Sequence, residues 1–572
     1  MDTLCKLLLY FDKRSYLHQM KSTCENFLGN LTEKIICKFP PLRFELEIDV
    51  IDLLDCFPDL ADLLLKEPLK WQIACNDILF ICMQSIENEY KENIKKSQVA
   101  VTLRLKCVSS LIVKTNPKDY KGLVIFDGLL LSTSKPESYV YHSVWSCLEE
   151  CEGNEVILPY IPKAPPKCYL CKTVLFENSG MRQCGEQIIA TFVLKDGLLT
   201  KTLNIVDDLI SKLQLGSRYL IHAVVLKKLT AVWGLEEVTL LATPHTSPIP
   251  NDIQNLYNAC KGVSWKFVYC LASGIGVNIC PLNCFMHLKI SLLLSLVSVR
   301  AHLITGSRIL HVLAAGYDTR YVTEIMQEAL RLTDSFVYLS TSNCDASTAL
   351  VASSSGICVM PFPLHLYHQK LILKVLSAVE SGEIFVDKSN AKLNCAIWAQ
   401  GMDYKKMTLH NAASVFGTAC RGDFNEHTDE LANFVLERAT DLSEISKEDQ
   451  ALKDLMVFID LVAGIEVLLD KTAETLLKEY FLAARRERPG GATLGSMGAL
   501  VAICINTARL CRRNVANTDD AVFAIWLHIS GGPEPRFAPD EYLQTPGDVT
   551  TLKNIIIKFK NWLQEFTGTL NL

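Results

Sequence analysis

Closely spaced prolines make residues 243–250 the strongest limit on how this chain can fold, because proline interrupts both helices and strands. The segment reads Thr-Pro-His-Thr-Ser-Pro-Ile-Pro. Short apolar runs separated by turn residues precede it, whereas apolar strands and helices alternate after it. We therefore expect a linker over residues 243–252 between two halves of different construction.

Composition indicates a large folded protein. The chain of 572 residues is 49% hydrophobic and 21% charged, which is enough apolar sequence for three or four packed domains. The net charge of −6 gives no overall attraction to nucleic acid. Any contact with DNA would therefore have to come from a local basic surface.

Neither secretion nor insertion into a membrane is expected. The N-terminus has a short apolar run without a basic start. The longest apolar run, residues 290–299, lies between Lys289 and Arg300 and is far shorter than the roughly 20 residues of a membrane span. The 22 cysteines are scattered through apolar segments, which is typical of buried, reduced thiols inside a cell.

The first half of the chain predicts two domains. Residues 1–98 read as a helical module with one amphipathic strand, residues 44–49, whose apolar side chains alternate. A helix should begin at Asp59, after Pro58, and end before Pro68. Residues 99–242 change to short strands, a spacing that fits an oligonucleotide/oligosaccharide-binding (OB) barrel. The expected strands are residues 123–131, 187–194, 219–226 and 238–241.

The second half predicts an α/β core followed by helices. Strands and helices alternate over residues 253–425, and helices dominate residues 426–530. We expect residues 531–572 to form a C-terminal tail. The fold class is thus multidomain, with α+β and α/β parts.

Two cysteine pairs give the strongest chemical signal. Cys147 and Cys151 are separated by three residues, and Cys168 and Cys171 by two. Two such pairs can converge on Zn²⁺ in a ribbon that is too small to hold itself together, and four thiolates would make the metal structural. The alternative is a chance group of free thiols in a cysteine-rich chain, and nearby Cys184 shows how easily one arises.

An apolar strand, residues 355–362, has the pattern of an ATPase strand that holds Mg²⁺. A site that hydrolyses nucleotide would end this strand in Asp-Glu, to bind the metal and orient water. Here Pro361 and Phe362 stand in their place, and neither can do that work.

The segment that would bind phosphate, residues 309–320, is equally incomplete. A working phosphate loop needs several glycines, then Lys for the phosphates and Ser or Thr for Mg²⁺. Only Gly316 remains, and Thr319 and Arg320 follow without a lysine. Arg320 could contact phosphate, but an exposed arginine at the start of a helix is the simpler and favoured explanation.

These segments, together with residues 349–352 and the helix expected around 370–379, resemble minichromosome maintenance (MCM) proteins. Three further positions agree with a degenerate site in that family. Gln400 stands where a sensor strand has Asn, Val415 replaces the arginine finger of Ser-Arg-Phe-Asp, and Gly495 replaces the arginine of the helical lid. The resemblance covers about residues 40–530 and is strongest to a divergent, meiotic branch of the family.

The resemblance implies an architecture. It implies an N-terminal A-like domain over residues 1–98, an OB fold with an inserted zinc ribbon over 99–242, and a degenerate AAA+ core over 253–425 with a helical lid over 426–530. ATP and Mg²⁺ are not expected as cofactors.

The function that the resemblance implies is a nuclear, non-catalytic scaffold of meiotic recombination, acting in double-strand break repair and crossover formation. Its partners would be DNA, without sequence specificity, and other MCM-like proteins. Two alternatives remain: a helicase subunit with divergent nucleotide motifs, and a zinc-ribbon/OB adaptor that binds proteins only.

One short basic segment could contact DNA. Lys227 and Lys228 precede Trp233 in an expected hairpin, so ammonium groups could meet phosphates while the indole meets a base or sugar. The alternative is a tryptophan packed on the barrel beside solvated lysines.

Overall fold

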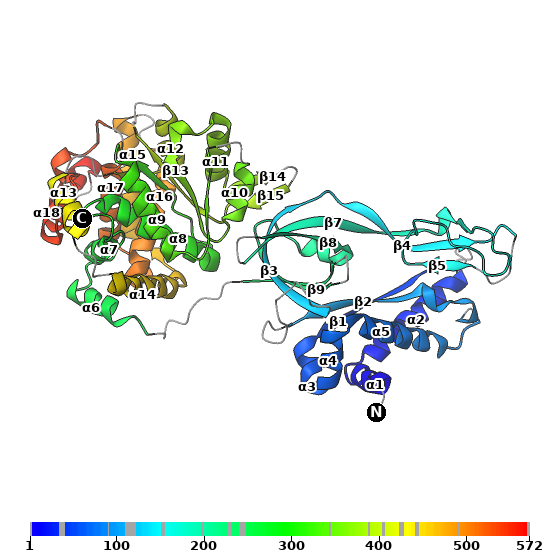
Figure 1. Cartoon of the computed structure of the whole chain (residues 1–572). Coiled ribbons are helices and arrows are strands. Elements are labelled where there is room, and N and C mark those ends of the chain that lie inside the picture. Colours follow the sequence, from blue (N-terminus) through cyan, green and yellow to red (C-terminus); the bar gives the residue numbers. More distant parts are fainter. Residues whose placement is uncertain are drawn as a thin grey trace. The chain divides into compact units, whose positions relative to one another are not determined.

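Two compact units make up the chain, residues Met1–Thr239 and Leu240–Leu572 (Figure 1). They divide just before the predicted linker. The computed structural model describes residues 3–33, 40–89, 91–108, 122–149, 151, 155–195, 199–225, 230–239, 248–341, 345–386, 389–402, 407–422, 428–440, 445–488, 492–532 and 534–568.

A helical module with a two-stranded sheet begins the first unit. The parallel strands β1 (Leu42–Asp49) and β2 (Val99–Lys106) are buried on alternate side chains. Asp49 ends β1 and accepts the N–H groups of Ile51 and Asp52, so the same residue starts the next helix. The helices are α1 (Thr3–Lys13), α2 (Tyr16–Glu33), α3 (Val50–Cys56), α4 (Pro58–Lys66) and α5 (Pro68–Gln84), followed by short turns at Lys91–Asn93 and Lys96–Gln98.

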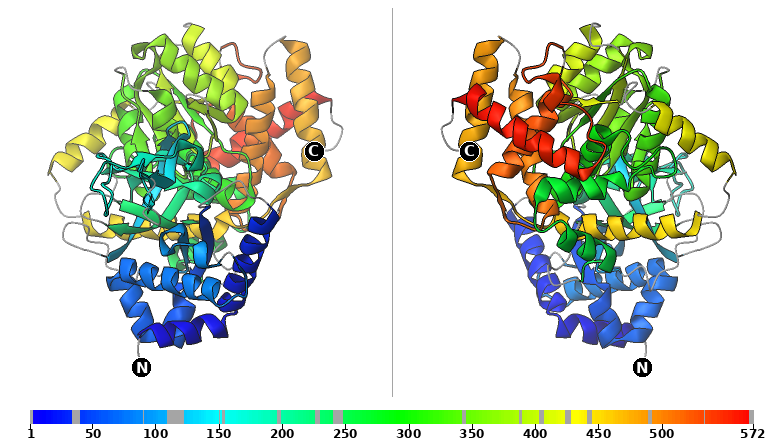
Figure 2. Two further views of the ribbon diagram at one scale, coloured as in Figure 1. Left: turned by 90° about the vertical axis from the view of Figure 1, so that its right-hand side faces the viewer. Right: turned by 90° about the vertical axis from the view of Figure 1, so that its left-hand side faces the viewer.

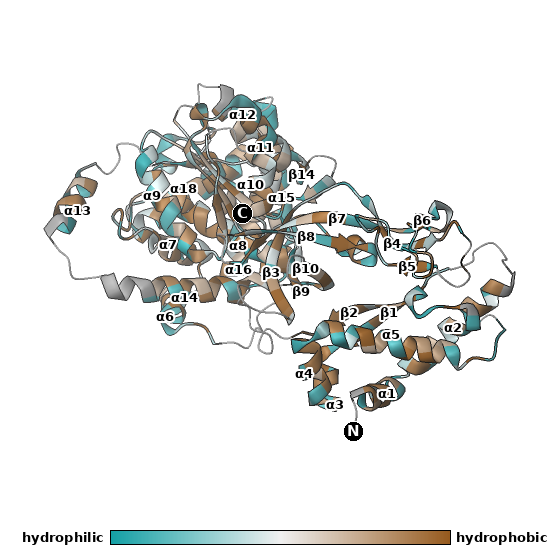
Figure 3. Ribbon diagram, turned by 45° about the vertical axis from the view of Figure 1, so that its right-hand side comes forward, coloured by the Kyte–Doolittle hydropathy of each residue, from teal (hydrophilic) through white to brown (hydrophobic). Residues whose placement is uncertain are grey.

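Five strands close into an OB-like barrel in the rest of this unit. They are β3 (Gly122–Thr133), β7 (Gln183–Leu194), β8 (Thr200–Val206), β9 (Arg218–Val225) and β10 (Thr230–Glu237). Their order is β3-β9-β10-β8-β7, and β7 pairs with β3 again, so the barrel has no open edge. β3 is buried along most of its length, consistent with its apolar colour in Figure 3.

The strand predicted over residues 238–241 is not found in its described part, because Val238 and Thr239 belong to no strand. The last barrel strand is β10, which pairs with β9 down to Glu237. The Val238 N–H still donates to the Arg218 carbonyl (2.8 Å). Residues 240–247 lie outside the described part of the chain. Pairing, not alternation alone, sets the end of this strand.

A small ribbon is inserted between β3 and β7. It contains β4 (Glu137–Ser146), β5 (Val156–Leu158) and β6 (Phe176–Glu177), with a short turn at Ser179–Met181. β4 pairs with β7 of the barrel at one end and with β5 and β6 at the other. The barrel therefore carries the ribbon on an extension of its own sheet.

A five-stranded parallel sheet forms the centre of the second unit. Its order is β12-β13-β16-β11-β17, that is, 2-3-4-1-5 along the chain. The bounds are β11 (Val312–Ala315), β12 (Phe336–Tyr338), β13 (Ile357–Pro363), β16 (Ala396–Gly401) and β17 (Cys420–Arg421). Parallel pairing is consistent with the α/β core expected from the sequence.

Helices cover this sheet. One group is α6 (Asn251–Ala259), α7 (Ser264–Ser273), α8 (Met286–Thr305) and α9 (Thr319–Ala329), with a turn at Leu330–Leu332. A second group is α10 (Ala346–Ala352), the turn Leu364–Leu366, α11 (Gln369–Ser381) and α12 (Met407–Phe416), with a hairpin of β14 (Glu383–Val386) and β15 (Ser389–Lys392).

The predicted helical region follows, as α13 (Thr428–Thr440), α14 (Ile445–Ala463), α15 (Lys471–Glu487), α16 (Leu494–Leu510) and α17 (Thr518–Ser530). A short parallel pair, β18 (Leu468–Leu469) and β19 (Val515–Ala516), joins two of its loops.

The predicted C-terminal tail is instead structured. After a turn at Asp540–Tyr542, residues Val549–Thr567 form α18, which lies against the helices that precede it (red and orange in Figure 2). Leu552, Ile555, Phe559 and Leu563 are buried in the same core as α15 and α17. Apolar residues at helical spacing explain this packing.

α8 is the one helix of the described residues that is long and apolar enough to cross a membrane. Every side chain from Met286 to Val299 is buried within the protein. A mostly apolar helix that is buried on every side is also typical of the centre of a large core.

Candidate functional sites

The four predicted cysteines come together at the tip of the ribbon. Their sulfur atoms all lie within 4.8 Å of one another, and the Sγ atoms of Cys147 and Cys171 are 3.4 Å apart. Cys147 directly follows β4, and Cys168 is buried while the other three are half-buried. Cys184, the extra thiol, is exposed on β7 and is not part of this group.

A tight turn presents the second pair. The Cys168 N–H donates to the Thr173 carbonyl (2.8 Å), and the Lys172 N–H donates back to the Cys168 carbonyl (3.1 Å). Burial alone would raise the pKa of the Cys168 thiol, but the N–H groups of Cys171 and Leu170 point at its sulfur and bring the pKa down to about 6. The turn thus favours a thiolate.

The group fits a tetrahedral metal centre. A Zn–S distance of about 2.3 Å places tetrahedral sulfur atoms about 3.8 Å apart, close to the separations found here. The local core is small, because only Trp145, Cys168 and Leu175 are fully buried in it. A bound metal would therefore contribute much of the stability of this ribbon.

Two of the predicted nucleotide-site positions meet in a closed hydrogen-bond cluster. Gln400 is 1% exposed, and its Nε2 donates to the carbonyl of Pro361 (2.5 Å) and to Oγ1 of Thr323 (2.7 Å). The Thr323 hydroxyl lies 2.9 Å from the same Pro361 oxygen. The amide nitrogen, the hydroxyl and the carbonyl bond to one another, while the buried Oε1 of Gln400 has no hydrogen-bond partner. The cluster contains no carboxylate that could hold Mg²⁺.

The geometry of β13 explains how Pro361 enters this cluster. The pairing of β13 with β16 shifts register between Val359 and Pro363, and Pro361 lies in that break. Proline is tolerated there because it has no N–H to give to a ladder. Its carbonyl turns to Gln400, while the neighbouring Phe362 is 48% exposed.

The loop after β11 is too short to wrap a phosphate chain. Only Gly316, Tyr317 and Asp318 separate the strand from α9, which begins at Thr319. A Cβ on Gly316 would lie 3.1 Å from the backbone of Gly422, so this glycine serves close packing against the strand beside it. The carboxyl of Asp318 stands at the helix start, and burial raises its pKa. An acid at this point repels the anion that a phosphate loop attracts.

Arg320 has the simpler of its two predicted environments. Its side chain is 88% exposed and its Nε donates to Glu324 Oε1 (2.9 Å), one turn along α9. This is an ordinary surface pair between residues four apart.

The two positions that lack an arginine lie beside each other. A Cβ on Gly495 would lie 3.0 Å from the Val415 carbonyl, and Gly417, in a left-handed conformation, would place its Cβ 2.2 Å from the Gly495 carbonyl. Thr493 Oγ1 also donates to the Ser414 carbonyl (2.9 Å). The end of α12 and the start of α16 thus meet backbone to backbone, which glycine permits.

Sequence reasoning missed Thr323 and Asp318. Thr323 lies one helical turn after Thr319, so both residues are on the same side of α9. This spacing is a signal in the sequence that could have identified Thr323. Asp318 is the residue before α9, and although its side chain makes no cap hydrogen bond, the preference for Asp at helix starts could have marked it.

Of the three residues expected to bind DNA, the structure describes Trp233 alone. Lys227 and Lys228 lie outside the described residues. Trp233 is 7% exposed and packs in the core shared by the barrel and the helical module, so its indole has no free face for a base. Among the predicted alternatives for Trp233, this burial matches the packed one.

Comparison with known proteins identifies the relatives of this chain. The sequence profile described as "MCMDC2, N-terminal domain" matches residues 3–108. Minichromosome maintenance domain-containing protein 2 of Rattus norvegicus is 21% identical over 91% of this chain and 89% of its own length. The protein of the same name from Mus musculus gives the same values, and that from Homo sapiens is 22% identical over 57% of this chain and 52% of its own.

Proposed function

Because the chain belongs to the minichromosome maintenance domain-containing protein 2 family, we propose that it is a non-catalytic scaffold of meiotic recombination. It acts in the nucleus, in double-strand break repair and crossover formation, and binds DNA and other MCM-like proteins. The process, the location and the partners come from the family resemblance.

The hydrogen-bond cluster of Gln400, Thr323 and Pro361 carries the non-catalytic part of this proposal. Transfer of a phosphoryl group to water needs acids on Mg²⁺, a lysine on the phosphates and an arginine for the developing charge. Neutral groups that bond to one another stand where the acids would be. The described loop after β11 has no lysine, and Val415 and Gly495 bring no charge.

The parallel sheet supports a degenerate AAA+ core. In this sheet β11, the strand that leads to Gly316, lies between two other strands and not at an edge. Retention of this architecture without its acids suits a subunit that packs with related subunits. The barrel and its ribbon support an OB domain with structural zinc, held by Cys147, Cys151, Cys168 and Cys171.

ATP hydrolysis by the purified full-length protein tests the proposal. We expect no phosphate release above the level of the buffer, with or without single-stranded DNA and Mg²⁺. DNA-stimulated hydrolysis would overturn the scaffold in favour of the divergent helicase subunit. Co-purification with MCM-like proteins, with binding retained in an Arg320→Ala variant, would support it.

One observation favours the third candidate, a protein-binding adaptor. At the turn between Cys168 and Cys171, Tyr169 is 79% exposed and Leu170 is 62% exposed. Exposed apolar side chains at the tip of the ribbon are suited to a protein partner. Protein binding without any affinity for DNA would select the adaptor over the DNA-binding scaffold.

A further inference from the structure

The second half of the ribbon carries lysines and aromatic rings without an acid. Residues 159–176 contain no Asp or Glu. Three exposed lysines lie in this segment: Lys163, Lys167 and Lys172. The described acids on either side of it already have partners, since Glu155 pairs with Lys95 and Glu177 with Arg182. A protein with a net charge of −6 needs a local basic surface of this kind to contact nucleic acid.

Backbone pairing places a lysine and an aromatic ring on one outward face of this segment. The segment turns back on itself, and Lys167 lies opposite Val174 in an antiparallel bridge. Side chains that lie opposite one another share a face. Phe176, two residues further along, lies on the same face, while the intervening Leu175 is buried in the core of the ribbon. Val174 is 45% exposed and Phe176 is 55% exposed, so an apolar strip faces solvent beside Lys167.

The turn at the end of this face holds a second ring and a second lysine together. The Nζ atom of Lys172 lies 4.9 Å from the centre of the Tyr169 ring. The backbone fixes the turn, because the Lys172 N–H donates to the Cys168 carbonyl (3.1 Å). Tyr169 is 79% exposed, so most of its ring remains accessible to a ligand. The turn that presents the second cysteine pair therefore also presents an aromatic ring with a cation beside it.

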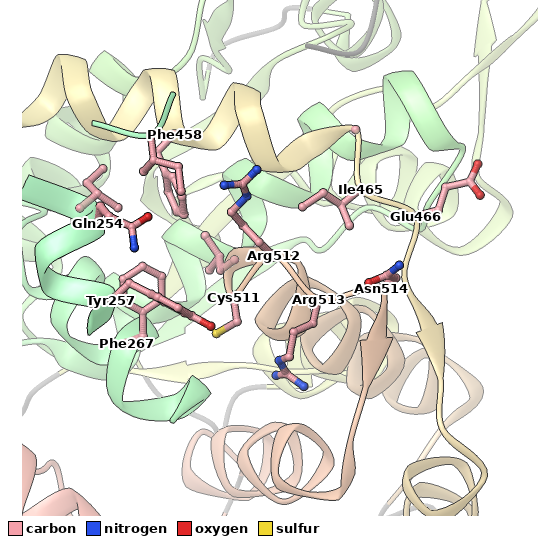
Figure 4. A pocket seen from close by; sticks show the side chains of 14 residues that line it. Gln254, Tyr257, Phe267, Phe458, Ile465, Glu466, Cys511, Arg512, Arg513 and Asn514 are labelled. Atoms are coloured by element: carbon pink, nitrogen blue, oxygen red, sulfur yellow. The ribbon is translucent and has the colours of Figure 1, made fainter. Parts of the chain in front are cut away.

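The cations of this face are available to a ligand. The side chains of Lys167 and Lys172 form no ion pair or hydrogen bond with any residue that the structure describes. The cavity of 770 Å³ between α6, α7 and the ends of α14 and α16 is different, although it has an aromatic wall (Figure 4). At its rim Arg513 donates to both oxygens of buried Asp520 (2.7 and 2.8 Å), and Arg512 also has interactions within the protein.

We propose that this face of the ribbon binds a single strand of DNA, with bases stacked on Tyr169 and Phe176 and phosphates at Lys167 and Lys172. Surfaces for single strands combine exposed rings with cations, because every base has a flat face and every nucleotide a phosphate. The four residues from Lys172 to Phe176 cover about 13 Å of extended chain, or about four base steps of 3.4 Å. The inference rests on the DNA binding of the proposed function, for which it names the surface.

Fluorescence anisotropy of a labelled oligodeoxythymidylate with the reduced full-length protein tests the proposal. Lys167→Gln with Lys172→Gln should weaken binding at least fivefold. It should also reduce the slope of log affinity against log salt by about 1.4, since two phosphate contacts are lost.

Tyr169→Leu with Phe176→Leu tests the rings separately. This double variant keeps apolar side chains on the face but removes the flat rings on which bases stack. Binding should weaken at least fivefold while the salt slope stays unchanged. Because all four side chains are exposed, the melting temperature should stay unchanged in both ribbon variants, which separates lost binding from lost folding.

Two double variants in the second unit are matched controls. Lys478→Gln with Lys553→Gln removes two exposed lysines, and Phe336→Leu with Tyr338→Leu removes two exposed rings. Both controls should bind the oligonucleotide as the unaltered protein does. Equal losses in the controls and the ribbon variants overturn the proposal.

The remaining outcomes separate this face from the wider function. Full affinity in both ribbon variants overturns the proposed face, while DNA binding by the scaffold still stands. No binding by the unaltered protein overturns both, and a protein partner held equally well by the leucine variant would then assign the face to the adaptor. Equal affinity for a duplex of the same length overturns the stacking of unpaired bases.

Discussion

Gln400 donates a hydrogen bond of 2.5 Å to the carbonyl oxygen of Pro361, and this bond joins a predicted sensor position to a predicted metal-binding position. In a motor the same two strands would hold water and Mg²⁺ between them. Here the strands are connected directly, and Thr323 of α9 completes the connection. Under the proposed function, this bond is a structural contact at the place where a motor has a ligand site.

Restoring acids at the end of β13 should not restore hydrolysis. The double variant Pro361→Asp with Phe362→Glu would supply metal ligands, but the described loop after β11 still has no lysine and Asp318 still stands at the start of α9. We expect phosphate release to stay at background, measured with and without DNA. DNA-stimulated release that disappears on Arg320→Ala would contradict both this expectation and the scaffold assignment.

Thr323→Val should destabilise the second unit by about 1–2 kcal/mol, because it removes one acceptor of the buried Gln400 amide while preserving shape. Urea denaturation followed by circular dichroism measures the change. Thr323→Ser keeps the hydroxyl and is the control, with a smaller loss. Equal stability of Thr323→Val and the unaltered protein would show that the cluster does not hold these strands together.

Zinc should leave the ribbon when one predicted ligand is removed. Cys168→Ser or Cys171→Ser takes away one of four converging thiolates, so we expect loss of about one zinc per chain and faster proteolysis within residues 140–190. Elemental analysis and limited proteolysis measure the two effects. Cys184→Ser is the control, because its thiol lies outside the group. Absence of zinc from reduced, unaltered protein would refute the metal centre.

Much of the fold was predicted wherever the residues that decide a helix or strand lie within that same segment. Pro58 begins α4 and Pro68 begins α5, as their fixed backbone angle favours, and the strand over residues 44–49 is found within β1. The group of four cysteines was also predicted, from the spacing of the two pairs and their place in the expected OB domain. In each case the residues that decide the structure are close together in the sequence.

Contacts between distant segments account for what the sequence did not predict. The bond between Gln400 and Pro361 depends on a register shift between β13 and β16, which no local pattern reveals. Residues 531–572 were expected to form a tail, because the apolar face of α18 becomes buried only through packing with α15 and α17, which precede it in the chain. Trp233 is similar, since its burial depends on the helical module that precedes the barrel.

Lys227→Ala with Lys228→Ala should weaken binding of single-stranded DNA regardless of sequence. Losing two phosphate contacts should reduce the slope of log affinity against log salt by about 1.4. Fluorescence anisotropy at several salt concentrations measures both. Trp233→Phe, a change within the core, should leave the affinity unchanged. An unaltered slope in the double variant would place the DNA surface elsewhere.

Asp208→Asn should make the first unit less stable and less sensitive to acid. Arg104 of β2 is 7% exposed and its Nε donates to both oxygens of Asp208 (3.0 and 3.1 Å), which connects the helical module to the barrel. Burial alone would raise the pKa of Asp208, but the hydrogen bonds and charge of Arg104 outweigh burial and lower it. A carboxyl whose pKa is lower in the folded state stabilises the protein above its ordinary pKa of about 3.9, and this contribution is lost as the pH falls through the folded value.

At neutral pH the Asp208→Asn substitution should therefore cost about 2 kcal/mol of unfolding free energy, since it leaves a buried guanidinium without its acid. Between about pH 5 and pH 3 the free energy of unfolding should fall less in Asp208→Asn than in the unaltered protein. Asp62→Asn, which removes an exposed partner of Lys66, is the control and should change stability by less than about 0.5 kcal/mol. Urea denaturation at a series of pH values measures these differences, and parallel pH profiles for Asp208→Asn and the unaltered protein would refute the role of this pair.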